Sequence, residues 1–235
     1  MSHRVALVTG SAQGIGLATA RALADAGHEV IGVDIRDHPA DAVARAIRAD
    51  LADPAAVEAL IAEVGEVDIL VNNAAILIEK SIDELSIEDW DRTMAVNVRA
   101  PFQLSRGLGA GMRRRRWGRI INIASIAGRT GGMTGPAPYA TSKGALITMT
   151  KHFARNYGPD GVTVNAIAPA GIMTPMAEAQ EQAHPGSQQL FLQQFALRRH
   201  ADPSEVATVV AFLASDGAAY MTGATLDVNG GWFMY

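Results

Sequence analysis

The sequence predicts an α/β fold in which helices cover both faces of a doubly wound parallel sheet, within a single domain spanning residues 1–235. Two observations support this prediction. Residues 4–9, RVALVT, form an apolar run bounded by glycine, which is typical of a strand buried on both faces. Similar runs recur along the chain and alternate with segments of helical periodicity. Such alternation is typical of crossover connections between parallel strands.

The first 34 residues have the pattern of a dinucleotide-binding unit. Gly10, Gly14 and Gly16 follow the first strand and open a helix, and a second short strand ends at Asp34. The glycines let the backbone approach a pyrophosphate, and the helix N-terminus offers it N–H groups and a favourable dipole. Asp34 stands where a carboxylate can accept hydrogen bonds from the adenosine ribose. Because its charge would repel a 2′-phosphate, the sequence favours NAD over NADP.

The later elements follow from the same alternation. Ser86 and Asp89 form a capping-box pattern at the start of a helix predicted to run through Asn97 to about Met112. Residues 35–50 predict a short or irregular helix and then a strand near 46–49. The other expected elements are helix 54–64, strands 67–71 and 119–124, a glycine-rich loop 128–138, helix 139–157, strand 161–167, a substrate lid 175–201, helix 203–215 and strand 224–228. The expected strand order is 3-2-1-4-5-6-7, that of a Rossmann-type sheet.

Composition and charge narrow the class of protein further. Hydrophobic residues make up 49% of the chain and charged residues 19%, so an ordered globular domain with a substantial core is expected. The formal net charge of −4 argues against a general nucleic-acid binder. The absence of cysteine excludes disulfides and thiolate metal sites, and the six histidines show no paired metal spacing. Without a signal peptide or a membrane-length apolar stretch, a soluble cytoplasmic protein with no membrane partner is expected.

Tyr139 and Lys143 are candidates for proton-transfer chemistry. Their spacing places them on one face of a predicted helix, so that an ammonium can lie close to a phenol. A nearby cation favours the phenolate and lowers the pKa of a tyrosine from its ordinary value near ~10. A phenol tuned in this way can exchange a proton with an alcohol or carbonyl near neutral pH. Ser125, at the end of the preceding strand, is expected to hydrogen-bond the same substrate oxygen.

Several motifs, each weak alone, together resemble the short-chain dehydrogenase/reductase family from about residue 4 to residue 231. These motifs are Thr9-Gly10-x-x-x-Gly14-x-Gly16, Asn72-Asn73-Ala74, Asn97, Ser125 and Tyr139-x-x-x-Lys143. The resemblance implies hydride transfer between NAD(H) and a small or cyclic secondary alcohol or ketone, with Tyr139 as the acid/base. It further implies that Lys143 also binds the nicotinamide ribose, that Asn97 supports proton exchange with water, and that the chain forms a homotetramer or homodimer.

The resemblance also predicts a cofactor site. Asp50 and Leu51 resemble a pair that lies against the adenine ring, although a turn or cap role for Asp50 is equally well supported. Ile172 and Thr174 match positions that meet the nicotinamide amide. Ala75 and Ala170 stand where the family usually has glycine. The complete predicted set is Gly10, Gln13, Gly14, Ile15, Gly16, Asp34, Asp50, Leu51, Asn73, Ala74, Ala75, Tyr139, Lys143, Pro169, Ala170, Ile172 and Thr174.

The substrate is less well defined by the sequence. The candidate pocket residues suggest a compact, mostly apolar site, and they are Ser125, Ile76, Ala127, Arg129, Ala170, Gly171, Met173 and Met176. An NADPH-dependent 3-oxoacyl (acyl-carrier) reductase is the main alternative, although Asp34 weighs against NADPH. Sugars and polyols stay open as substrates. Relatives with epimerase or dehydratase chemistry and a non-catalytic dinucleotide-binding protein are further alternatives. The apolar residues Trp232–Tyr235 are expected to pack locally or at a subunit contact, with the resemblance favouring the contact.

Overall fold

The structure is a computed structural model, and it describes residues 3–132, 136–183 and 185–234. Seven parallel strands form one sheet in the order β3-β2-β1-β4-β5-β6-β7, which confirms the predicted fold class and strand order. The strands are β1 (Val5–Thr9), β2 (Glu29–Asp34), β3 (Arg45–Arg48), β4 (Ile69–Asn72), β5 (Gly118–Ile123), β6 (Val162–Pro169) and β7 (Thr225–Val228).

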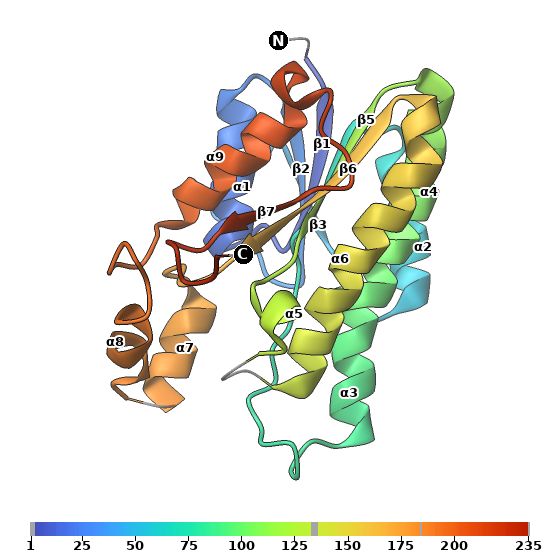
Figure 1. Cartoon of the computed structure of the whole chain (residues 1–235). Coiled ribbons are helices and arrows are strands. Elements are labelled where there is room, and N and C mark those ends of the chain that lie inside the picture. The colour runs from blue at the N-terminus through green and yellow to red at the C-terminus, as the bar shows by residue number, and fades with distance from the viewer. Residues whose placement is uncertain (1–2, 133–135, 184, 235) are drawn as a thin grey trace.

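Helices cover both faces of the sheet (Figure 1). On one face lie α1 (Gly14–Asp25) and α9 (Pro203–Ala214), and on the other lie α2 (Pro54–Val64), α4 (Ala100–Arg115) and α6 (Ala137–Tyr157). The side chains of β1 alternate between two cores: Ala6 and Val8 pack toward α1 and α9, and Leu7 packs in the core of the other face. The shorter helices are α3 (Ile87–Met94), α5 (Ala127–Thr130), α7 (Pro175–Ala183) and α8 (Ser187–Leu192).

The helix predicted from Ser86 to about Met112 is interrupted. Its capping box forms as expected, because Ser86 accepts a hydrogen bond from the Asp89 N–H and the Asp89 carboxylate accepts one from the Ser86 N–H. A π-helical turn then separates α3 from α4 at Ala95–Arg99. Such a turn contains one residue more than a regular helical turn and often lies at a functional site. Here it contains Asn97.

Two local predictions were wrong. Residues 35–44 contain turns and bends but no helix. The strand predicted near 46–49 is present as β3 and begins one residue earlier, at Arg45. A turn in which the Ala42 N–H donates to the Pro39 carbonyl takes the place of the expected helix. The loop predicted at 128–138 contains the short helix α5, and its residues 133–135 lie outside the described part of the chain. Within that part, no helix combines the length and apolar character needed to cross a bilayer.

A chain of buried polar side chains joins β4, β5 and α6. Asn72 donates to Asn122 at 2.8 Å, Asn122 donates to Thr150 at 2.8 Å, and Thr150 donates to the Leu146 carbonyl at 2.8 Å. All three polar side chains are nearly inaccessible to solvent. Because an unpaired buried polar group costs roughly 1–3 kcal/mol, each hydrogen bond in this chain avoids a penalty of that size.

We expect the substitution Asn122→Ala to lower the free energy of unfolding by about 3 kcal/mol, because Asn72 and Thr150 each lose a partner. Urea unfolding followed by circular dichroism would measure the change. Asn156→Ala is the matched control, because Asn156 is exposed and its side chain bonds only within its own helix. Equal effects of the two substitutions would contradict the importance of the buried chain.

Candidate active site

A pocket of about 720 Å³ is lined by residues at the carboxyl ends of the strands and in the segments that follow them. All seventeen predicted cofactor residues line it, as do the candidate substrate residues Ser125, Ile76, Ala127, Gly171 and Met176. The pocket therefore joins residues that are as far apart in the sequence as Gly10 and Trp232.

The glycine-rich turn after β1 forms a tight cradle. A Cβ atom on Gly16 would lie 2.0 Å from the Gly10 carbonyl oxygen, and one on Gly10 would lie 2.8 Å from the Ala74 Cα. Gln13 is the N-cap residue of α1 and makes no side-chain capping hydrogen bond. The first N–H groups of this helix are thus available to an anion, and the cradle fits a pyrophosphate.

Asp34 is held at the end of the pocket where β2 terminates. Its carboxylate accepts hydrogen bonds from the N–H groups of Ala12 and Arg36, each at 3.0 Å. Beside it, the Ser11 hydroxyl is hydrogen-bonded to the His38 ring at 2.8 Å, a contact that the sequence analysis missed. A Cβ on Gly32 would lie 2.7 Å from that ring nitrogen, so glycine is required for His38 to reach the turn.

Ser125, Tyr139 and Lys143 meet at another part of the pocket. The Ser125 hydroxyl is hydrogen-bonded to the Tyr139 side chain and accepts a hydrogen bond from the Ala127 N–H at 3.1 Å. The Lys143 ammonium donates to the Ile123 carbonyl at 2.7 Å and lies 5.5 Å from the centroid of the Tyr139 ring. The four-residue spacing thus brings phenol and ammonium into one site.

The electrostatics of this pair differ from the expectation. Burial raises the pKa of Tyr139 above its ordinary value, and the Ser125 hydrogen bond opposes that rise only in part. Burial also lowers the pKa of Lys143 to about 7, with only 2% of the residue exposed. The expected lowering of the Tyr139 pKa is therefore not seen in the cofactor-free protein, because desolvation outweighs other influences on both groups.

Asn97 lies behind the pocket and does not line it. Its side chain is fully buried, accepts a hydrogen bond from the Ile76 N–H at 2.9 Å and donates to the Ile76 carbonyl at 3.0 Å. It also donates to the Ser142 hydroxyl at 3.0 Å, which in turn donates to the Tyr139 carbonyl at 2.7 Å. Asn97 therefore fixes both the pocket wall at Ile76 and the helix that carries Tyr139. Its expected part in proton exchange stays a prediction.

Two candidate pocket residues point elsewhere. Arg129 forms an ion pair with Asp227 at 2.9 Å and donates to the Thr225 carbonyl at 2.9 Å, so it joins α5 to β7 rather than lining the pocket. Met173 is 45% exposed, because the bridge between Ile172 and Ala201 turns alternate side chains inward and outward, and Ile172 takes the buried position.

Both departures from the family's glycines are accommodated. Ala75 keeps a negative φ, which an alanine adopts without strain. Gly171 has a φ of +65°, and a Cβ there would lie 2.7 Å from the Phe195 ring, so glycine is needed one residue after Ala170. Despite this shift, Ile172 and Thr174 still line the pocket.

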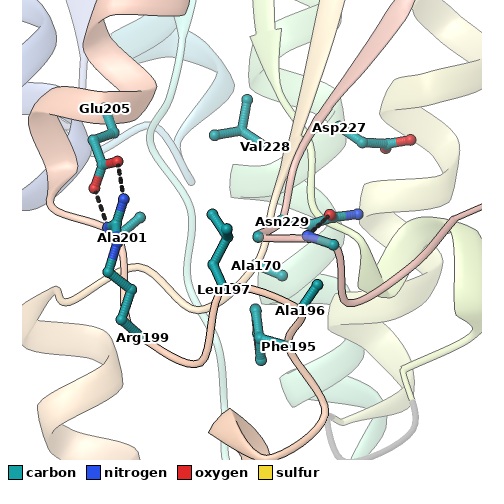
Figure 2. Close-up of a pocket in the computed structure, with 12 residues that line it drawn as sticks. Ala170, Phe195, Ala196, Leu197, Arg199, Ala201, Glu205, Asp227, Val228 and Asn229 are labelled. Atoms are coloured by element: carbon teal, nitrogen blue, oxygen red, sulfur yellow. Dashed lines mark hydrogen bonds and ion pairs between the residues drawn. The ribbon is translucent and has the colours of Figure 1, made fainter.

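The sequence analysis missed several residues that line the pocket. They are Arg36, Leu77, Glu79, Arg92, Val96, Thr130, Gln180, Phe191 and Trp232, among others. The apolar run at Trp232 was a usable signal, but a subunit contact was the favoured explanation. A second cavity of about 420 Å³ lies nearby and shares Ala170 with the first; Figure 2 shows Phe195, Leu197 and the ion pair between Arg199 and Glu205 in its wall.

No group of three or more potential metal ligands occurs within the part of the chain that the structure describes. With the fold, this arrangement of glycine cradle, carboxylate at the end of β2 and Ser–Tyr–Lys cluster is that of a dinucleotide-binding protein of the doubly wound α/β class.

Comparison with known proteins agrees with this class. The family model described as enoyl-(acyl carrier protein) reductase matches residues 10–233. The chain is 40% identical over 242 residues to the 3-oxoacyl-(acyl-carrier-protein) reductase FabG of Escherichia coli K12, covering 98% of each protein. It is 38% identical over 248 residues to FabG of Aquifex aeolicus, covering 99% of this chain and 98% of that protein.

Solved structures agree as well. A protein of Beutenbergia cavernae provisionally named an NAD(P)-dependent gluconate 5-dehydrogenase, solved with low-occupancy NADP, superposes with a TM-score of 0.94 and 34% identity, covering 99% of this chain and 97% of that one. The aldohexose dehydrogenase of Thermoplasma acidophilum has a TM-score of 0.90 and 34% identity, covering 98% and 94%. The chain belongs to the short-chain dehydrogenase/reductase family. It is an oxidoreductase of that family, with a nicotinamide dinucleotide as cofactor.

The lowered pKa of Lys143 predicts a pH dependence of stability. An unfolded lysine keeps its ordinary pKa of 10.5, so between about pH 7 and 10.5 the unfolded chain binds a proton that the folded chain does not. Stability should rise with pH in this window, by up to about 1.4 kcal/mol per pH unit. We expect the unfolding free energy of the wild type, relative to that of Lys143→Met, to rise by roughly 2–3 kcal/mol from about pH 7 to about pH 9.

Urea unfolding of the cofactor-free protein at several pH values would measure this difference. Lys151→Met, on the exposed side of the same helix, is the matched control for the loss of a lysine. A difference between wild type and Lys143→Met that stays constant with pH would contradict the prediction.

Proposed function

We propose that this protein transfers a hydride between NAD(H) and a secondary alcohol or ketone, with Tyr139 as the acid/base. The observation that carries the proposal is a single pocket that contains the glycine cradle and Asp34 as well as the Ser125, Tyr139 and Lys143 cluster. A dinucleotide on the cradle could extend along this pocket to the cluster, in the way that doubly wound sheets bind such cofactors.

In the proposed mechanism the bound nicotinamide supplies or accepts the hydride, and the protein handles the proton. During reduction, Tyr139 donates its phenolic proton to the ketone oxygen as the carbon receives the hydride, and an alcohol forms. Ser125 donates a hydrogen bond to the developing charge on that oxygen. Lys143 stabilises the phenolate left on Tyr139 and binds the nicotinamide ribose. Oxidation of an alcohol follows the same steps in reverse.

The raised pKa of Tyr139 is consistent with its proposed role as a proton donor. Burial keeps the phenol protonated in the cofactor-free protein, so it is ready to act as an acid. Oxidation would first require the phenol to lose its proton, at a cost that a raised pKa increases.

Two substrate classes are supported by relatives. The FabG proteins, by their names, act on 3-oxoacyl groups carried by a protein, and they cover nearly the whole chain at 38–40% identity. Apolar lining residues such as Ile76, Leu77 and Met176 suit an acyl chain. Structural neighbours named for gluconate and aldohexose dehydrogenation support sugars as the second class. We propose a 3-oxoacyl thioester as the first class to test.

For the cofactor, the residues and the relatives point in different directions. Asp34 is held by two backbone N–H groups in a position that suits the ribose hydroxyls and disfavours a 2′-phosphate, which supports NAD(H). Two solved relatives, from Beutenbergia cavernae and Agrobacterium tumefaciens, were obtained with bound NADP, which supports NADP(H). We propose NAD(H) on the basis of the carboxylate.

We expect Tyr139→Phe to lower kcat for ketone reduction by roughly 10²–10⁴-fold, because the acid is lost while the ring is kept. The dissociation constant for NADH, measured by its fluorescence, should change by no more than about twofold, since the phenol itself is a minor part of the cofactor surface. Tyr220→Phe, at a fully exposed tyrosine, is the matched control. Undiminished turnover by Tyr139→Phe would rule out the assigned role.

We expect the wild type to bind NADH at least roughly tenfold more tightly than NADPH, because a carboxylate close to a 2′-phosphate costs on the order of 1–4 kcal/mol. Asp34→Asn should bring the ratio of the dissociation constants for NADPH and NADH closer to one. Asp37→Asn, at an exposed aspartate on the same connection, should leave it unchanged. Parallel fluorescence titrations with both reduced cofactors would measure the ratio, and tighter binding of NADPH by the wild type would refute the proposal.

A further inference from the structure

The segment after β7 reaches the pocket through Trp232. Asn229, which is nearly buried, shapes this segment: its side chain accepts a hydrogen bond from the Gly231 N–H at 2.9 Å and donates to the Phe233 carbonyl at 2.9 Å. The Trp232 N–H donates to the Asn229 carbonyl at 3.0 Å. Trp232 is thus held in place by a turn whose polar groups are used internally, so it packs locally, and the subunit contact expected for this segment stays a prediction.

Three aromatic rings from two separate segments pack together. Trp232 lies 5.3 Å from Phe191 of α8 and 6.2 Å from Phe195, ring centroid to ring centroid, and the rings of Phe191 and Phe195 are 4.8 Å apart. Phe191 and Trp232 line the pocket. The segment at 175–201, expected from the sequence to be a lid, is therefore attached at its aromatic end to the segment after β7.

Phe195 anchors this group. Only 2% of the residue is exposed, and its ring fits against two glycines: a Cβ would lie 2.7 Å away on Gly171 and 3.0 Å away on Gly230. Figure 2 shows Phe195 beside the segment that carries Asn229. Since any larger residue at either glycine would displace the ring, the position of Phe195, and through it that of Trp232, is closely fixed.

The position of Trp232 is at the substrate end of the pocket. It packs against the cluster formed by Ile126, Ala170 and Phe195, and Ile126 directly follows Ser125 in the sequence. The indole N–H donates to the Gln194 side chain at 2.9 Å. Because this is the only polar atom of the indole, the part of the ring that faces the pocket offers carbon alone.

We propose that Trp232, supported by Phe191 and Phe195, determines substrate specificity by selecting a substrate with an apolar group next to its carbonyl, such as an acyl chain. This inference rests on the proposed function. A methylene chain on the indole gains from burial of apolar surface. A sugar hydroxyl placed against the indole would lose water there and gain no hydrogen bond from the ring in return, which penalises its binding at this position. Trp232 and its two aromatic neighbours would thus distinguish the two substrate classes that the relatives suggest.

The test compares two ketone substrates, each with the reduced cofactor that the wild type binds more tightly. One is the N-acetylcysteamine thioester of 3-oxohexanoic acid, and the other is 5-keto-D-gluconate. We expect the wild type to have at least roughly tenfold higher kcat/KM for the thioester. Trp232→Ala should raise KM for the thioester roughly tenfold with kcat changed less than about threefold, and Trp232→Phe should restore most of the loss.

Trp90→Ala is the matched control, because Trp90 lies on α3 and does not line the pocket. Circular dichroism and cofactor titration would establish that each variant is folded. If the wild type reduces a ketone but prefers 5-keto-D-gluconate, or if Trp232→Ala leaves KM for the thioester unchanged, the inference fails and the proposed function stands.

A binding measurement separates the inference from catalysis. In the variant Trp90→Phe/Trp117→Phe, Trp232 is the one remaining tryptophan of the three in the sequence. Quenching of its fluorescence by the thioester but not by 5-keto-D-gluconate would support the inferred role of Trp232 even if no turnover is observed. In that case only the proposed reaction fails. If neither turnover nor a fluorescence response is observed, both the inference and the proposed function are overturned.

Discussion

The close approach of the turn after β1 to the loop after β4 is the constraint on which the rest of the site depends. Asn73 donates to the carbonyls of Thr9 and Gly10 at 2.8 and 3.0 Å, and the Thr9 hydroxyl accepts hydrogen bonds from the N–H groups of Asn73 and Ala74, both at 3.0 Å. A side chain on Gly10 or Gly16 would force these segments apart. Because β1 lies where the strand order reverses, this contact fixes both the start of α1 and the crevice beside it.

The part of the pocket that contains Ser125, Tyr139 and Lys143 depends on a different feature, the exclusion of water. Lys143 is buried with its ammonium on the Ile123 carbonyl rather than on a carboxylate, and Tyr139 is held in its protonated form. Both groups carry a desolvation cost that the remaining structure has to offset. Asn97 and Ser142 provide part of that support by bonding to the backbone on either side of the cluster. The burial of Lys143 and Tyr139 thus lowers the stability of the fold, as is common for groups with a proposed catalytic role.

The fold and the cofactor crevice were predictable because they follow from local patterns. Strand and helix periodicity give the layers, and the glycines and Asp34 mark positions where the backbone itself has to approach a ligand. Other features depend on contacts between distant segments. The pKa of Tyr139 depends on how deeply α6 is buried, which the spacing to Lys143 does not contain. Arg129 is drawn toward Asp227, almost a hundred residues later, so its sequence neighbours gave no sign of its direction.

The π-helical turn at Asn97 and the packing of Trp232 against Phe191 and Phe195 illustrate the same limit. A capping box and helical periodicity predict where a helix begins. The π-helical turn, however, is accompanied by hydrogen bonds from Asn97 to Ile76 and Ser142, which are distant in the sequence. The sequence identified residues 232–235 as too apolar for solvent without indicating what would cover them. Of these residues, Trp232 packs against Phe191 and Phe195, whereas Met234 is exposed.

The place of Trp232 after the last strand also bears on the order in which the site is assembled during translation. Proteins emerge from the ribosome N-terminus first, and the glycine cradle, Asp34 and the Ser125–Lys143 cluster all precede residue 170. The apolar wall of the substrate pocket arrives only with residue 232, after every strand of the sheet. A nascent chain therefore acquires the parts of its cofactor groove well before it can discriminate between substrates, and selectivity is the last property that synthesis confers.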